Sequence, residues 1–196
     1  LIENIDYLKT NMVYSLLCAR DYLNDDVIVS YGDIIYEPII LETIMRSERN
    51  ISVAVDMNWL SYWKLRFDNP LSDAETLRIG KKQELIEIGN KPRNYKDIEA
   101  QFMGLMKINK KGLKDILTLC DSINTKNDEL PLNLNGKPVE VAYTTDLLNQ
   151  LIIENISVSA IMVSGTWVEV DSIADLESDV TNQRCRIIDK AIYKIY

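Results

Sequence analysis

Short apolar runs that end in an aspartate constrain this chain more than any other feature. Residues 27–31 are apolar and rich in β-branched side chains, and Gly32 and Asp33 follow them. Residues 51–55 form a second run of this kind, and Asp56 follows it. Neither run alternates regularly between polar and apolar side chains, which is typical of strands covered on both faces. The chain therefore has to build a sheet that is flanked by helices on both sides.

Helical patterns alternate with strand patterns along the rest of the chain. Further strands are predicted over residues 76–79, 85–88, 101–108, 158–163 and 166–170. Helices are predicted over residues 11–24, 38–45, 110–123, 139–154 and 172–196. Residues 57–73 break the pattern and are interpreted as a long functional loop. This order predicts one α/β domain over residues 1–196, with a mainly parallel mixed sheet flanked by helices.

Composition excludes several classes of function. The 30 acidic and 22 basic residues give a net charge of -8, which argues against nucleic acid as a partner. No apolar run approaches the ~20 residues of a membrane span, and no signal peptide is recognisable. Three cysteines far apart in the sequence indicate reduced thiols in a cytoplasmic protein. The absence of histidine leaves carboxylates, lysines, backbone groups or a metal for any catalysis.

Three predicted strands end in an aspartate: Asp33, Asp56 and Asp171. Open α/β sheets bind ligands beyond the carboxyl ends of their strands. Two such carboxylates within reach of one ion would make an oxygen-rich site that suits magnesium, and the ion would bridge substrate phosphates. The spacing alone leaves an alternative open, in which each aspartate caps the helix or turn that follows it.

An ordered set of motifs covers most of the chain. It consists of Gly32-Asp33 at a strand end, the strand FMGLMK over residues 102–107, and Trp167 followed by Glu169 and Asp171. The set resembles the nucleotidyltransferases that act on sugar phosphates, phosphocholine and aminoethylphosphonate. The resemblance implies a Rossmann-like nucleotide-diphospho-sugar transferase fold. It also implies that Asp33 and Asp171 are the catalytic residues, because they hold Mg²⁺.

Members of that family condense a nucleoside triphosphate with a small phosphorylated or phosphonate acceptor and release pyrophosphate. The resemblance favours CTP, with phosphocholine, aminoethylphosphonate or a sugar 1-phosphate as acceptor. Asn11 and Ser15 lie in the segment that precedes the Gly-Asp strand and are expected to bind substrate. Glu169 is expected in or near the magnesium site. The segment that contains Thr145 and Asp146 resembles a helix near the acceptor.

The stretch after Asp56 carries the candidate acceptor-binding residues. Trp59 and Trp63 could hold an ammonium group against their ring faces, and Arg66 could bind a phosphate or phosphonate with its guanidinium fork. Trp167 could form a further wall of the substrate site. The alternative is that these aromatic residues pack in the core and that Arg66 pairs with Asp68 or Asp73.

The chain also departs from the family pattern. Members begin with a strand and a loop of the form GxGxR, which supplies backbone donors to the triphosphate. The first seventy residues here contain one glycine, Gly32. The expected fold is therefore N-terminally incomplete, and this fragment is expected to bind a triphosphate poorly. Two rival interpretations are a non-catalytic binding or assembly module with a degenerate nucleotidyltransferase fold, and a glycosyltransferase. The apolar run at residues 186–196 leaves a homodimer open.

Overall fold

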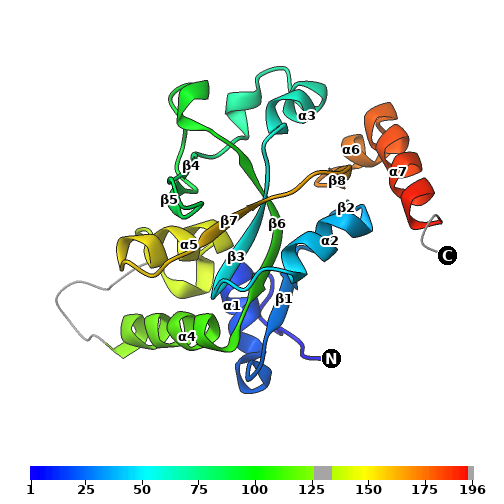
Figure 1. The fold of residues 1–196 in the computed structure, drawn as a ribbon. Helices are drawn as coiled ribbons and strands as arrows, with labels where there is room; N and C mark the ends of the chain where they lie inside the picture. The colour runs from blue at the N-terminus through cyan, green and yellow to red at the C-terminus, as the bar shows by residue number, and fades with distance from the viewer. Residues whose placement is uncertain (126–133, 194–196) are drawn as a thin grey trace.

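The computed structural model describes residues 1–125 and 134–193 and is built around a four-stranded sheet (Figure 1). The strand order is β1-β6-β3-β7, with bounds Val27–Ser30, Gln101–Ile108, Ile51–Asp56 and Ser159–Met162. β6 pairs antiparallel with both of its neighbours, and β3 pairs parallel with β7. Three strands thus run in one direction and β6 in the other, which agrees with the predicted mixed sheet. Because β6 lies between β1 and β3, two of the three pairings are antiparallel, so the sheet is less parallel than predicted.

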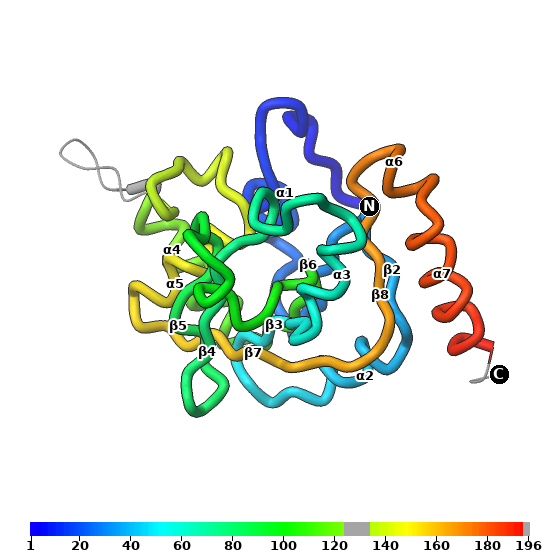
Figure 2. Tube along the Cα trace, turned by 90° about the horizontal axis from the view of Figure 1, so that it is seen from above, coloured from blue at the N-terminus to red at the C-terminus, as the bar shows by residue number. Residues whose placement is uncertain are grey.

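Helices cover both faces of this sheet. One face packs against α1 (Met12–Cys18), α4 (Lys110–Thr125) and α5 (Thr144–Ile153), and the other packs against α2 (Pro38–Met45) and α3 (Trp59–Arg66). Figure 2 shows α4 and α5 on one side of the strands and α7 on the other. Because side chains alternate along a strand, Val53 and Val55 of β3 enter one core, and Ala54 between them enters the other.

Two small antiparallel ribbons complete the fold. β2 (Ile34–Tyr36) pairs with β8 (Trp167–Glu169), and β4 (Leu77–Ile79) pairs with β5 (Leu85–Ile88). The pairing of β2 with β8 joins residues from opposite ends of the chain, since Ile34 faces Glu169. α6 (Ile173–Glu177) and α7 (Asp179–Ile192) follow β8, and α7 packs on this ribbon. Short 3₁₀ turns occur at Arg20–Tyr22, Pro70–Ser72, Tyr95–Asp97 and Val139–Val141.

The predicted long loop over residues 57–73 is wrong. It contains α3, whose residues Trp59, Tyr62 and Trp63 are all buried. Their spacing of three and four residues places them on one side of a helix, so burial of this aromatic side stabilises α3 against the sheet.

Several predicted boundaries also move. The first helix stops at Cys18, and the helix predicted from residue 139 begins only at Thr144. The C-terminal helix is interrupted at Ser178, whose hydroxyl accepts the Thr181 N–H and caps a new helix, α7. Residues 194–196 of that prediction lie outside the described residues. Among the helices that the structure describes, none has the length and apolarity needed to cross a membrane.

Candidate active site

The β2–β8 ribbon places the two predicted magnesium ligands at one end. Glu169 is the last residue of β8, and Asp171 lies two residues further along. Asp33 directly precedes β2, and its carbonyl accepts a hydrogen bond of 2.9 Å from the Val170 N–H. Asp33 and Asp171 therefore emerge from adjacent points of two hydrogen-bonded backbones, although they lie far apart in sequence.

The carboxylates at this end of the ribbon share one electrostatic environment. Burial raises the pKa of Glu169 to about 7, against the opposing effect of a hydrogen bond from Arg66. The negative charges of Asp171 and Asp33 raise the pKa of Glu169 further. This end of the ribbon thus brings the carboxylates of Asp33, Glu169 and Asp171 within electrostatic reach of one another.

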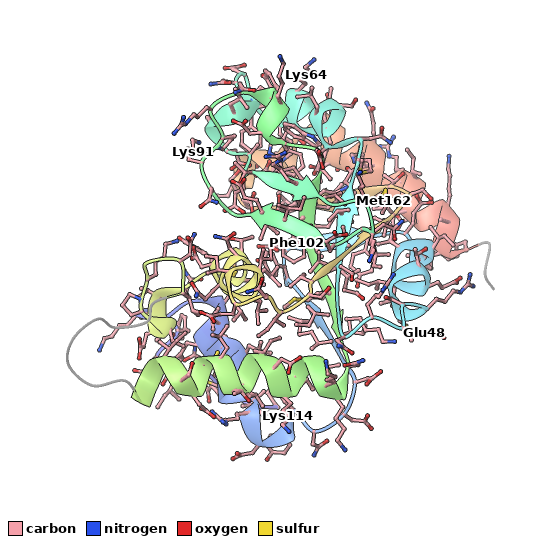
Figure 3. All side chains as sticks on the ribbon, turned by 60° about the vertical axis from the view of Figure 1, so that its left-hand side comes forward. Glu48, Lys64, Lys91, Phe102, Lys114 and Met162 are labelled. Carbon is pink, nitrogen blue, oxygen red and sulfur yellow. The ribbon has the colours of Figure 1, made fainter. Side chains whose placement is uncertain are left out.

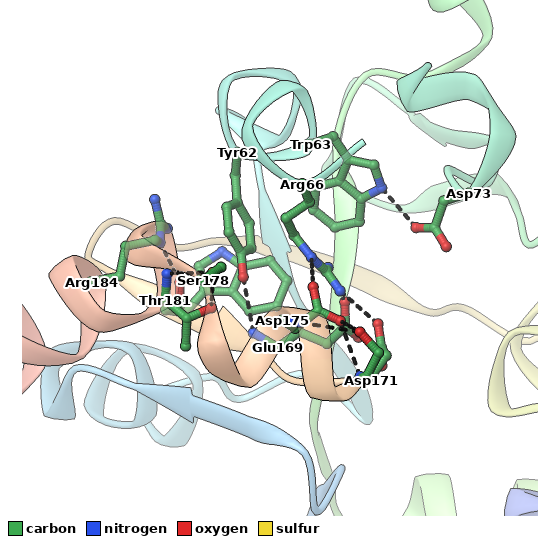
Figure 4. Close-up of polar contacts among 12 residues, drawn as sticks. Tyr62, Trp63, Arg66, Asp73, Glu169, Asp171, Asp175, Ser178, Thr181 and Arg184 are labelled. Atoms are coloured by element: carbon green, nitrogen blue, oxygen red, sulfur yellow. Dashed lines mark hydrogen bonds and ion pairs between the residues drawn. The ribbon is translucent and has the colours of Figure 1, made fainter. Parts of the chain in front are cut away.

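Arg66, at the end of α3, neutralises part of this charge (Figure 4). Its guanidinium bonds three carboxylates: Nη1 lies 2.7 Å from Glu169 Oε2, Nη2 lies 2.6 Å from Asp171 Oδ2, and Nε lies 3.2 Å from Asp175 Oδ1. The Arg66 side chain is only 4% exposed. The alternative interpretation expected Arg66 to pair with Asp68 or Asp73. Among the described residues, Arg66 forms no ion pair with either of them. Arg66 ties α3 to β8 and α6.

The three tryptophans lie in an aromatic core around α3 and β8. Trp59, Trp63 and Trp167 are all nearly fully buried, and the Tyr62 ring packs edge-to-face on both Trp63 and Trp167. Of the three indoles, that of Trp63 alone lines a cavity described below. Trp59 and Trp167 are thus core residues, which agrees with the alternative interpretation that these aromatic side chains pack in the core.

Asp56, the third strand-ending aspartate, has a structural role. Its Oδ2 accepts a hydrogen bond of 2.9 Å from the Trp167 indole N–H, and its Oδ1 accepts one of 2.7 Å from the Asn58 N–H. Asp56 is therefore the buried acceptor that fixes the Trp167 ring, and it caps the turn into α3.

A first cavity, of about 290 Å³, lies between β6, α3, α5 and the residues after β8. Four carboxylates line it: Asp73, Glu75, Glu169 and Asp171. Aromatic walls come from Tyr31, Trp63, Phe102 and Tyr143. Phe102 lies at the centre of the molecule in Figure 3, whereas the labelled charges of Glu48, Lys64, Lys91 and Lys114 lie at its periphery. Among the described residues, no lysine or arginine lines this cavity.

A second cavity, of about 470 Å³, adjoins the first between α1, β1 and α5. Asn11, Ser15 and Asp33 line it, so these three predicted site residues are brought together. The polar groups of Asn11 and Ser15 also have partners within the chain. Asn11 Oδ1 accepts the Met12 N–H at 2.8 Å, and Ser15 Oγ accepts from Asn4 Nδ2 at 2.9 Å.

Tyr31 belongs to both cavities and forms part of the wall between them. Its ring lies against Gly104 of β6, where a Cβ atom would stand 2.5 Å from the ring carbons. Gly104 also has a φ of +75°, which glycine adopts without strain. The glycine of the FMGLMK motif is therefore required so that the Tyr31 ring can pack closely against β6 between the two cavities.

Sequence reasoning missed several residues of the first cavity. Glu75, Gln101 and Asp73 line it, and none of them was expected to bind substrate or metal. Asp73 lies in the predicted functional loop but was named only as an alternative partner of Arg66. Thr145, from the helix predicted near the acceptor, also lines it. Its neighbour Asp146 is only 2% exposed and bonds Lys137 Nζ at 2.7 Å, which gives Asp146 a structural role.

Comparison with known proteins identifies the family. The chain is 32% identical over 183 residues to the CTP:phosphoglutamine cytidylyltransferase of Campylobacter jejuni, and the match covers 90% of this chain and 70% of the relative. The chain belongs to the nucleotidyltransferase family. The resemblance found in the sequence motifs is thereby confirmed. No family model matches the chain.

Solved nucleotidyltransferase structures share the fold. The inositol-1-phosphate CTP transferase of T. maritima superposes with a TM-score of 0.66 at 19% identity over 94% of this chain. A putative glucose-1-phosphate thymidylyltransferase from Bacillus anthracis superposes with a TM-score of 0.59 at 18% identity over 90% of this chain. The chain spans 65% and 62% of the lengths of these two nucleotidyltransferases. The predicted nucleotide-diphospho-sugar transferase fold is confirmed.

Proposed function

We propose that this chain is the catalytic part of a magnesium-dependent cytidylyltransferase, which joins CTP to a small phosphorylated acceptor and releases pyrophosphate. One observation carries the proposal: Asp33 and Asp171 emerge from the same end of the β2–β8 ribbon, and each lines one of two adjoining cavities. The Campylobacter jejuni relative is named for CTP and phosphoglutamine, which supports CTP as donor and a phosphorylated amino-acid derivative as acceptor.

The carboxylates fit a magnesium ion in kind and in number. Magnesium in phosphate-transfer sites is held by one or two carboxylates together with substrate phosphates and water, so a complete protein cage is not required. Among the described residues, no three or more histidine, cysteine, aspartate or glutamate side chains are grouped to hold a metal, and Asp171 Oδ2 already accepts a hydrogen bond of 2.6 Å from Arg66. The ion would therefore rely on one or two carboxylates together with phosphate and water oxygens. Asp33 and Asp171 would hold the ion, with Glu169 beside them. When bound, the ion would neutralise charge on the reacting phosphates.

The chemistry needs positioning rather than a nucleophilic side chain. An oxygen of the acceptor phosphate attacks the α-phosphorus of CTP, a new P–O bond forms, and the bond to the bridging oxygen of pyrophosphate breaks. The role of the two cavities is to hold the reacting groups in line. We assign the nucleotide to the larger second cavity, with Asn11 and Ser15 at its edge, and the acceptor to the first cavity. Trp63 would then be a wall of the acceptor site, whereas Trp59, Arg66 and Trp167 would support the site from outside.

The test measures pyrophosphate release by the chain together with any sequence that precedes Leu1 in its gene. CTP, UTP, GTP and ATP are each paired with phosphoglutamine, phosphocholine, aminoethylphosphonate and a sugar 1-phosphate. We expect release with CTP and one class of acceptor, and loss of that release when EDTA removes the metal. Pyrophosphate release with none of these pairs would refute the proposed function.

Two variants test the assignment of the ligands. Asp33→Asn and Asp171→Asn should each lower kcat by about 100-fold or more, because a carboxylate that holds the charge-neutralising ion is lost. The matched control is Asp189→Asn on α7, an exposed aspartate outside both cavities, which should keep full activity. Full activity in either of the first two variants removes that residue from the metal site.

A further inference from the structure

The first cavity contains a carboxylate, that of Glu75, which forms no ion pair within the described chain, although the positive charge of Lys137 acts on it from a distance. Of its four acidic residues, Glu169 and Asp171 are ion-paired with Arg66, and Asp73 accepts a hydrogen bond from the Trp63 indole. Glu75 receives one side-chain hydrogen bond, a long one of 3.5 Å from the Thr145 hydroxyl. Within residues 1–125 and 134–193, no lysine or arginine forms an ion pair with Glu75. The Glu75 carboxylate therefore has capacity for a further donor.

The backbone of Glu75 is held firmly in place. The side-chain amide of Gln101 forms two hydrogen bonds with the Glu75 backbone. Nε2 donates to the Glu75 carbonyl at 2.6 Å, and Oε1 accepts from the Glu75 N–H at 3.3 Å. Gln101 is only 5% exposed, so water competes little for these bonds. The residue that carries the unpaired carboxylate is thus fixed at the cavity wall.

Thr145 is brought to Glu75 by a second constraint. A Cβ atom at Gly89 would stand 2.8 Å from Thr145 Cβ, and Gly89 has a φ of +83°. Glycine at this position therefore allows the end of β5 and the start of α5 to approach closely enough for the hydroxyl to reach Glu75. Burial of this carboxyl also raises its pKa, which a neighbouring cation would reverse.

The surroundings of Glu75 favour a cationic ligand group. A sugar phosphate would bring negative charge, and no positive charge, into a cavity lined by four carboxylates. An ammonium group would pair with Glu75 and would also be attracted by the aromatic rings of Tyr31 and Phe102, which line the same cavity, whereas the Tyr143 ring already holds Lys137 Nζ at 4.4 Å. The cavity is thus complementary to a molecule that carries its own cation at one end.

We infer that Glu75 binds an ammonium group of the acceptor, so that the acceptor is a phosphorylated or phosphonate amine whose phosphorus lies at the Asp171 end of the cavity. The inference rests on the proposed function and adds the residue that selects the acceptor. Glu75 is a specificity-determining residue, and the reacting atoms do not contact it.

The test compares acceptors that differ in one amino group. The pairs are aminoethylphosphonate with ethylphosphonate, and phosphoglutamine with its analogue in which hydrogen replaces the α-amino group. We expect the wild-type chain, with any sequence that precedes Leu1, to prefer one amine over its matched analogue by about 10- to 100-fold in kcat/KM, the range of a charged hydrogen bond. Glu75→Gln should remove most of this preference through the KM for the amine, and the KM for CTP should not change.

Controls separate the inference from the proposed function and from misfolding. Glu87→Gln changes a half-buried glutamate on β5 that bonds Asn90 and lies outside the cavity lining, and it should keep the preference. Thr145→Val removes the hydroxyl beside Glu75 and should lower the preference by a smaller factor. Calorimetry of each acceptor without CTP provides a readout that is independent of catalysis.

The outcomes are distinct. Turnover of an amine and its analogue with equal kcat/KM, or an unchanged preference in folded Glu75→Gln, overturns the inference while the proposed function stands. Absence of pyrophosphate release with every nucleotide refutes the proposed function, and the calorimetric comparison then decides whether Glu75 still binds the amine.

Discussion

The two faces of the sheet carry cores of different chemistry. The core shared with α1, α4 and α5 is formed by aliphatic residues together with Met106 and Cys120. The core shared with α2 and α3 contains the three tryptophans and Tyr62, and buried polar groups such as Asp56 bond to them. The first core can be built from any well-packed apolar side chains, whereas the second depends on particular hydrogen bonds and ion pairs.

This difference matches the position of the candidate site. The aromatic core holds β8 and the start of α6 through Arg66, Asp56 and Trp167, and these elements carry Glu169 and Asp171. Among the residues that the structure describes, no hydrogen bond or ion pair joins a side chain of the aliphatic core to Glu169 or Asp171. Substitutions in the aliphatic core should therefore destabilise the whole domain uniformly. Substitutions in the aromatic core should also have a local effect at the candidate site.

The largest expected loss of stability is in the aliphatic core. Leu148 on α5 is fully buried, and Leu148→Ala should lower the free energy of unfolding by about 4 kcal/mol, because it removes apolar contacts and leaves a cavity. Urea denaturation measures this value. Leu65→Ala on α3, which is 60% exposed, is the control and should change it by less than about 0.5 kcal/mol. A loss below about 1 kcal/mol at Leu148 would mean that this core is not closely packed.

The next effect concerns the ion pairs of the aromatic side. Arg66→Met should cost about 3 kcal/mol, because three carboxylates lose their common partner. Unlike the leucine substitution, it should also speed amide hydrogen exchange mainly in residues 167–177. Arg46→Met breaks an exposed ion pair with Glu42, and it should change neither the free energy of unfolding nor the rate of amide exchange in residues 167–177. Uniform destabilisation without a local change in exchange would remove the contrast between the two cores.

A comparison of two indoles tests whether a hydrogen bond stabilises the fold more when the aspartate that accepts it is buried. Trp167 and Trp63 each donate a hydrogen bond of 2.9 Å to an aspartate, but Asp56 is buried and Asp73 is exposed. Trp167→Phe should lower the free energy of unfolding by about 2 kcal/mol, because Asp56 loses a donor that water cannot replace. Trp63→Phe should cost roughly half as much. Equal losses in thermal or urea unfolding would show that the bond to Asp56 has no special weight.

The smallest effect concerns thiol chemistry and leaves stability unchanged. Burial in the aliphatic core raises the pKa of Cys120 to about 11, so about one molecule in a thousand carries the thiolate at pH 8, against about one in four for an ordinary thiol. Native protein treated with a disulfide reagent at pH 8 should therefore react at the half-buried Cys18 and Cys185 and not at Cys120. Mass spectrometry identifies the labelled residues. The rate at Cys120 should rise as the pH approaches 11.

Much of the fold could be predicted because its strands are locally encoded. Residues 51–55 and 101–108 are apolar enough to be strands whatever their neighbours, and both predictions were confirmed. β2, with three residues, carries too little local signal and depends on its pairing with β8. The helix α3 did carry a signal, since Trp59, Tyr62, Trp63 and Arg66 follow helical spacing, but the interpretation of its aromatic residues as ligand contacts obscured it.

The candidate site was less predictable than the fold. Asp33, Asp56 and Asp171 were singled out because each ends a predicted strand, and the resemblance to a family then selected Asp33 and Asp171 as predicted metal ligands. No local pattern reveals that β2 and β8 pair. Glu75 could not be found in this way. Its environment is created by Gln101 and Thr145, which come from two other elements, and a sequence does not show which glutamates lack a partner.

The pairing of β2 with β8 has a consequence for biosynthesis. Because the backbone of Asp33 bonds to that of Val170, the acidic end of the ribbon cannot form until Val170 has been synthesised. Closing so long a segment is slow compared with local helix formation, so β8 and α7 should dock late. A nascent or truncated chain that stops before Trp167 therefore has one aspartate of the pair and no site. The proposed activity would thus appear only after residues 167–171 have been synthesised and have paired with β2.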